Sequence, residues 1–97
     1  MKLLEDKIIK IGDKDFTAKM GMRAMINFEK LSGHSIDSIT TLEDAIMLFY
    51  SAIKKSAGDL TYEQFLDLID DNMDAVNEFT QWAMVGAVEK KQTDLSI

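Results

Sequence analysis

The chain has 97 residues, of which 46% are hydrophobic and 29% are charged, and it contains no cysteine and no proline. This composition predicts a single folded domain over residues 1–97 and excludes disulfides and thiolate metal sites. The formal net charge of −6 disfavours nucleic acid and anionic membranes as partners, because both bind basic surfaces.

The first predicted element is a β-hairpin over about residues 7–20, where apolar residues lie on both sides of a polar turn. A two-residue turn at Asp13-Lys14 would pair Ile11 with Phe16 and Ile9 with Ala18. An isolated hairpin is only marginally stable, so we expect its apolar face to pack against helices.

Four helices are predicted after the hairpin. In the first, apolar residues recur at helical spacing from Ala24 through Met25 and Phe28 to Leu31, and Gly33 suits a left-handed cap. The predicted helices cover about residues 22–32, 41–56, 62–71 and 73–90, with a frayed tail over 92–97.

The second helix has the widest apolar face, from Leu42 to Ile53, and is expected to be the most buried. Two alternative N-terminal capping pairs are possible for this helix, Thr40 with Glu43 and Thr41 with Asp44.

The third helix has the clearest start signal. Thr61 and Gln64 form a capping box, and Leu60 with Phe65 forms a hydrophobic staple. The run Asp70-Asp71-Asn72 is expected to break the chain, since acids are unfavourable at a helix C-terminus. Together these elements predict a mainly α fold of the α+β class, with a short N-terminal β-hairpin packed on a bundle of about four helices.

Charge is distributed unevenly along the chain. Nine of the eleven basic residues lie between Lys2 and Lys55, whereas the segment from Ser56 to Glu89 has eight acids and no Lys or Arg. This acidic segment is either a solvated face that keeps the protein soluble or a docking surface for a basic partner.

Neither a membrane span nor a signal peptide is indicated. No apolar run approaches the roughly 20 residues that cross a bilayer. Glu5 and Asp6 interrupt the N-terminal apolar residues too early for a signal-peptide core. We therefore expect a cytoplasmic protein.

No metal site is predicted. The segment from Gly58 to Leu66 is similar to the second half of a calcium-binding EF-hand loop, but Gln64 stands where the chelating acid is required. Upstream, the ligand positions fall on Ile53, Lys55 and Ala57, which offer no anionic oxygen. A second group, at Asp67, Asp70, Asp71 and Asp74, shares one helical face and is interpreted as solvated.

No catalytic or cofactor-binding residue is predicted either. His34 is the only histidine, and it is expected to be a surface or hydrogen-bonding residue. Ser32 and Ser35 lie too close to it in sequence to form a catalytic triad by themselves. The five glycines are scattered singly, so no phosphate-binding loop is present. The expectation is a protein that is not an enzyme.

Methionine and aromatic residues near the fourth helix have two interpretations. Seven methionines in 97 residues are either core residues or part of an adaptable binding surface. Aromatic residues of this helix are either core anchors or interface hot spots. The candidate protein-binding residues are Met73, Phe79, Trp82 and Met84.

The stretch from Ile9 to Ile39 resembles the tail assembly chaperones of long-tailed bacteriophages and prophages. The matching features are the hairpin with Gly12-Asp13-Lys14-Asp15-Phe16, the helix from Met22 to Leu31, and its ending Ser32-Gly33-His34-Ser35-Ile36. Beyond Thr40 the resemblance is one of architecture only, and none of its motifs is as specific as a metal-binding motif.

The resemblance implies a non-enzymatic protein that binds and solubilises the tape-measure protein while the tail tube assembles. The implied setting is the cytoplasm of the bacterial host, with the tail-tube subunit as a second candidate partner and a homo-oligomer left open. The alternative function is a small acidic helical adaptor or regulatory domain that binds another protein.

The resemblance also implies an expectation about the gene. Many members of this family are made in two lengths by a programmed −1 ribosomal frameshift. Glu89-Lys90-Lys91 is compatible with codons that contain a slippery run, although the same tripeptide also suits the end of an ordinary solvated helix.

Overall fold

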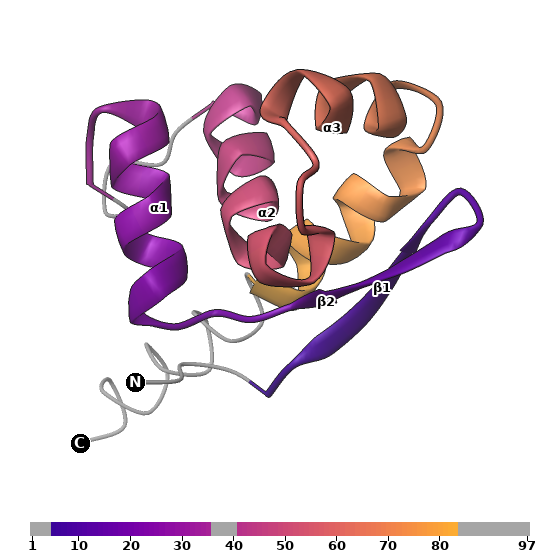
Figure 1. Cartoon of the computed structure of the whole chain (residues 1–97), viewed down its shortest axis with the longest axis horizontal. Coiled ribbons are helices and arrows are strands. Elements are labelled where there is room, and N and C mark those ends of the chain that lie inside the picture. Colours follow the sequence, from indigo (N-terminus) through magenta and orange to yellow (C-terminus); the bar gives the residue numbers. More distant parts are fainter. Residues whose placement is uncertain (1–4, 36–40, 84–97) are drawn as a thin grey trace.

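The computed structural model describes residues 5–35 and 41–83 (Figure 1). Its elements are β1 (Lys7–Ile11), β2 (Lys14–Ala18), α1 (Met22–Ser32), α2 (Leu42–Ala57) and α3 (Tyr62–Asp70). A fourth helix occupies residues 73–83. The predicted α+β class, with an N-terminal hairpin followed by helices, is confirmed. The predictions for Thr40, for Met84 and for residues 85–97 lie outside the described residues.

The hairpin confirms the predicted strands but not the predicted register. Its two strands are antiparallel, with Ile9 opposite Phe16 and Ile11 opposite Lys14. The predicted pairing of Ile11 with Phe16 and of Ile9 with Ala18 is therefore wrong, because the partner of each isoleucine lies two residues earlier in β2 than predicted. A shift of two residues keeps every side chain on its face, so the predicted apolar face is still the buried one.

The physical reason for the register is the turn at Gly12-Asp13. Gly12 has a φ of 66°, whereas no non-glycine residue of the described chain has a positive φ. A positive φ at the first central residue is typical of a type II′ turn, which favours glycine there. The turn therefore begins at Gly12 and leaves Lys14 as the first residue of β2.

Helix α2 is the centre of the core, as predicted. All seven residues from Met47 to Ile53 are buried. Leu42, which was expected on the same buried face, is 62% exposed. It is the first residue of α2 and lies ahead of the part of the helix that is surrounded by other elements. Leu31, which was expected on the apolar face of α1, is 37% exposed.

Aromatic side chains join α2 to the two helices that follow it. The ring of Phe49 stacks on Phe79 of the fourth helix, with centroids 4.6 Å apart. The same ring meets Phe65 of α3 edge-on at 5.2 Å. All three side chains are at most 1% exposed. Phe65 is also the N4 residue of the predicted staple, and the Thr61–Gln64 capping box is present as predicted.

The outer edge of β2 is bound to α2. The backbone N–H of Lys19 donates to the carbonyl oxygen of Ala52 at 3.0 Å, and that of Thr17 donates to Oγ of Ser56 at 2.9 Å. Helix α2 thus covers a sheet edge that would otherwise present free backbone groups. This explains how a two-stranded hairpin is held in place beside the helices (Figure 1).

Asn72 fixes the hairpin turn to the break between α3 and the fourth helix. Its Oδ1 accepts from the backbone N–H of Gly12 at 3.1 Å, and its Nδ2 donates to the carbonyl oxygen of Leu68 at 2.8 Å. A partly exposed ion pair between Lys7 Nζ and Glu78 Oε2, at 3.2 Å, adds a second contact between hairpin and fourth helix. The sequence predicted the break at this position but not its contact with the turn.

Replacing Phe49 by alanine tests the central position of this ring. We expect Phe49→Ala to lower the free energy of unfolding by about 3–5 kcal/mol, because it removes a fully buried ring and leaves a cavity. Leu42→Ala, in the same helix but at an exposed position, is the matched control and should change it by less than about 0.5 kcal/mol. Urea unfolding measures both, and similar losses in the two variants would contradict this core assignment.

Asn72→Ala tests the connection between the turn and the helix break. We expect a loss of about 1–2 kcal/mol, because Gly12 N–H and the Leu68 carbonyl each lose a partner. Asn77→Ala, exposed on the fourth helix, is the control and should be nearly neutral. Thermal unfolding with the same midpoint for both variants would rule out the proposed role of Asn72.

Candidate functional site

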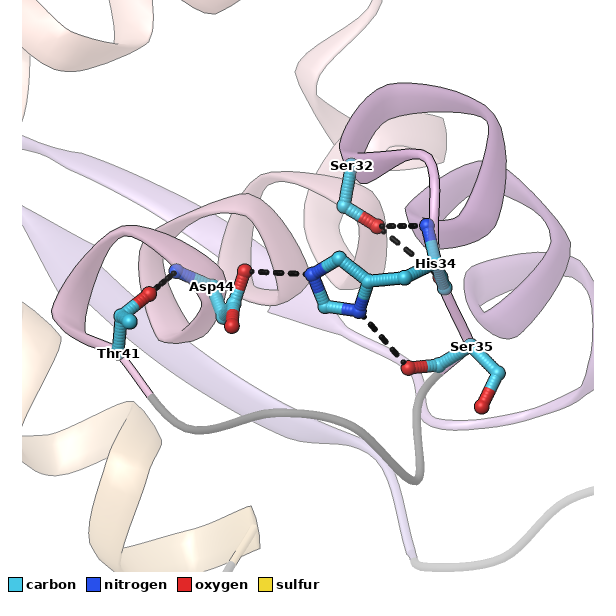
Figure 2. Close-up of polar contacts among 5 residues, drawn as sticks. All are labelled: Ser32, His34, Ser35, Thr41 and Asp44. Carbon is cyan, nitrogen blue, oxygen red and sulfur yellow. Dashed lines mark hydrogen bonds and ion pairs between the residues drawn. The ribbon is translucent and has the colours of Figure 1, made fainter.

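The most densely connected polar cluster lies where α1 ends and α2 begins (Figure 2). Helix α1 ends at Gly33, whose φ of 84° is left-handed and whose N–H donates to the carbonyl oxygen of Glu29 at 2.9 Å. This turn, which is typical of a glycine cap, places the His34 ring beside Phe28. The two rings meet edge-on, with centroids 5.4 Å apart.

Both nitrogens of the His34 ring contact oxygen acceptors. Nε2 lies 2.9 Å from Oδ1 of Asp44, and Nδ1 lies 3.1 Å from the carbonyl oxygen of Ser35. A neutral imidazole has one N–H, whereas the charged imidazolium has two. Only the charged form donates to both acceptors. The expectation that His34 is a hydrogen-bonding residue is confirmed.

These contacts raise the pKa of His34 above its ordinary value of 6.5. The main cause is the hydrogen bond to the Ser35 carbonyl, followed by the hydrogen bond to the Asp44 carboxylate. Partial desolvation of the ring acts in the opposite direction and is the weaker influence. These contacts extend the pH range over which the imidazolium is populated to higher pH.

Asp44 is held in position by the start of α2. Its backbone N–H donates to Oγ1 of the N-cap residue Thr41 at 3.1 Å, so the second of the two predicted caps is present. The Asp44 side chain is buried, at 8% exposure. The first turn of a helix, where Asp44 lies, is a position at which the helix dipole favours an acidic side chain.

The cluster does not have the geometry of a nucleophilic site. The hydroxyl of Ser32 contacts the backbone of His34, accepting from its N–H at 3.3 Å and donating to its carbonyl at 3.1 Å. A serine nucleophile in this cluster would need a His34 ring nitrogen that can accept its hydroxyl proton, and both ring nitrogens already contact other oxygens. The contacts instead form a polar clamp between the two helices, made by His34, Asp44, Thr41, Ser32 and Ser35.

The predicted protein-binding residues fall into different environments. Met73 is 44% exposed at the start of the fourth helix. Trp82 is half-buried and packs against Phe79, with ring centroids 5.7 Å apart. Phe79 itself belongs to the core. The structure thus brings Phe79 and Trp82 together, and Met84 lies outside the described residues.

Within residues 5–35 and 41–83, no group of three or more His, Asp or Glu side chains is arranged to hold a metal ion. No helix there is both long and apolar enough to cross a membrane.

Sequence reasoning missed Asp44 as the partner of His34 and Asn72 as the partner of Gly12. The first pair is separated by ten residues and the second by sixty. One feature of the sequence could have indicated the first pair. Asp44 lies in the first turn of α2, where a side chain is close to the residues that precede the helix.

Comparison with models of known protein families, with curated proteins and with solved structures finds no match to this chain.

The clamp predicts a pH-dependent stability. Because the folded-state pKa of His34 is raised, its contribution is fully present below about pH 6.5 and is lost as the pH rises through the folded-state value. The difference in unfolding free energy between wild type and His34→Gln should therefore shrink as the pH rises above 6.5. Urea unfolding at several pH values measures it.

Asp44→Asn provides the matched test of the same clamp. Without the carboxylate, the variant should lose part of the pH dependence that wild type shows over this window. A difference between wild type and His34→Gln that stays constant or grows with pH would contradict the clamp.

Proposed function

We propose that this chain is a non-enzymatic tail assembly chaperone that binds the phage tape-measure protein and keeps it soluble. The observation that carries the proposal is the structural role of the residues on which the resemblance rests. Gly12-Asp13 forms the hairpin turn, Met22–Ser32 is a single helix, and Gly33 with His34 ends it in the polar clamp. A motif whose residues have defined roles in the fold supports a shared architecture better than a match of letters alone.

Exposed apolar side chains support a role in protein binding. Met22 and Ile26 lie one turn apart on α1 and are 50% and 44% exposed. Met73 is similarly exposed at the start of the fourth helix. Flexible and aliphatic side chains of this kind suit the apolar face of a partner helix. A tape-measure protein, which is long and helical, would offer such faces.

The acidic half of the chain supports a solubilising role. On α3 and the fourth helix, the exposed acids include Glu63, Asp67, Asp70, Asp74 and Glu78. Such a surface resists aggregation and attracts basic partner segments. The proposal places the chain in the host cytoplasm, with the tail-tube subunit as a second candidate partner and self-association left open.

The absence of enzymatic activity is part of the proposal. It is supported by the clamp, where the only histidine of the chain has both ring nitrogens engaged with oxygens. The alternative, a helical adaptor for another protein, draws support from the same exposed apolar residues. The two functions differ in one respect: only the chaperone should increase the solubility of a long helical partner.

Co-expression tests the proposal directly. The tape-measure protein encoded beside this chain should be recovered in the soluble fraction with the chain and in the insoluble fraction without it. Met73→Glu should lower this recovery severalfold, because it puts a charge into the apolar contact. Gln81→Glu adds the same charge at an exposed position of the same helix and should leave recovery unchanged.

A partner that is bound by the chain but stays insoluble would favour the adaptor function. Equal recovery of soluble tape-measure protein with both variants would show that Met73 is not part of the binding surface. No binding and no gain in solubility would overturn the chaperone proposal.

A further inference from the structure

A positively lined cavity lies beside the start of α1. Its volume is about 390 Å³, and it is bounded by the segment that joins β2 to α1, the first turns of α1 and the middle of α2. Three basic side chains line it, namely Lys19, Arg23 and Lys55, and no acidic side chain does. This is unusual in a chain with a net charge of −6, since three of its eleven basic residues meet at one cavity.

The positive charge of this cavity is only weakly neutralised within the protein. Lys19 Nζ lies 3.7 Å from Oδ2 of Asp6, and both side chains are substantially exposed, so the pair is weak and screened by solvent. Among the described residues, no carboxylate lies within ion-pair distance of Arg23 or Lys55. Within that part of the chain, two of the three cations therefore have no carboxylate partner that would compete with an external anion.

The cavity also has an apolar wall. Met20, which is buried, and Met22, which is half exposed, line it together with Ala24 and Ala52. A bare inorganic anion would gain nothing from methionine side chains and would fill only a small part of the volume. The lining therefore fits a ligand that carries negative charge and an apolar group together.

We propose that this cavity binds an acidic segment of a protein partner, with an apolar side chain against the two methionines and carboxylates against Lys19, Arg23 and Lys55. The three cations favour an acidic segment, and the wall formed by Met20 and Met22 favours one that carries an apolar side chain over the uniformly charged phosphate backbone of a nucleic acid. The inference goes beyond the proposed function, because it holds for a chaperone and for an adaptor alike.

A synthetic peptide tests the inference. The probe is a short fluorescent peptide in which two leucines are flanked by glutamates, and the control peptide has glutamine in place of every glutamate. Binding is followed by fluorescence anisotropy and mapped by amide chemical shifts. We expect the acidic peptide to bind, to shift the amides of Arg23, Ala52 and Lys55, and to weaken at high salt.

Matched triple variants identify the cations. The cavity variant should weaken peptide binding about tenfold or more; it carries Lys19→Gln, Arg23→Gln and Lys55→Gln. The control variant changes net charge equally at exposed sites and should retain most of the binding; it carries Lys10→Gln, Lys14→Gln and Lys30→Gln. Arg23→Glu alone should weaken binding further than Arg23→Gln. Thermal unfolding of each variant separates loss of binding from loss of fold.

Three results would overturn the inference. One is equal binding by wild type and the cavity variant, and another is equal loss in both triple variants. The third is inorganic phosphate or the glutamine peptide shifting the same amides with the same affinity as the acidic peptide. Because the probe is not the tape-measure protein, these outcomes are independent of whether the chain is a chaperone.

Discussion

Helix α2 is in contact with each of the other helices and with β2, and the rest of the described structure depends on this arrangement. Its middle turns carry the apolar side chains that α1, α3 and the fourth helix cover. Its C-terminal half supplies the carbonyl of Ala52 and the hydroxyl of Ser56 that hold β2. A small domain buries a limited fraction of its surface, so a single helix that is covered on several sides is an efficient way to form one core.

Polar contacts then fix the elements that surround this core. His34 and Asp44 join the end of α1 to the start of α2, while Asn72 joins the hairpin turn to the end of α3. Each contact is made at a place where the chain changes direction. Such contacts each contribute about 1 kcal/mol to stability, and they also specify how the helices and the hairpin are oriented. In this arrangement, Met22 at the start of α1 and Met73 at the start of the fourth helix are exposed at the surface.

Local features of the fold could be predicted from the sequence, and long-range ones could not. Thr61, Gln64 and Phe65 act within a few residues of one another, so the start of α3 followed from spacing alone. The hairpin register depended on which residue took a positive φ: the turn was predicted at Asp13-Lys14, whereas the positive φ belongs to Gly12 and the turn is Gly12-Asp13. Helical periodicity placed Leu42 on the buried face, but it does not show where along the helix the neighbouring elements begin.

The candidate binding surfaces show the same difference between local features, which the sequence predicts, and long-range ones, which it does not. Periodicity and composition identified Trp82 and Met73 as residues of interest, but only the packing showed that Phe79 is core and that Met73 is open. The cavity at Lys19, Arg23 and Lys55 combines residues from three segments, and nothing in their spacing marks them as neighbours. Both proposals about binding therefore depend on the arrangement around α2 being correct.

Native-state hydrogen exchange tests that arrangement most directly. The amide protons from Met47 to Ile53 should be the slowest in the chain and should exchange only through global unfolding, because every side chain in this segment is buried. Amides of β1 and of the first turn of α1 should exchange faster through local opening. If the amides of α1 or of the hairpin were slower than those of α2, the account of a core organised around α2 would be contradicted.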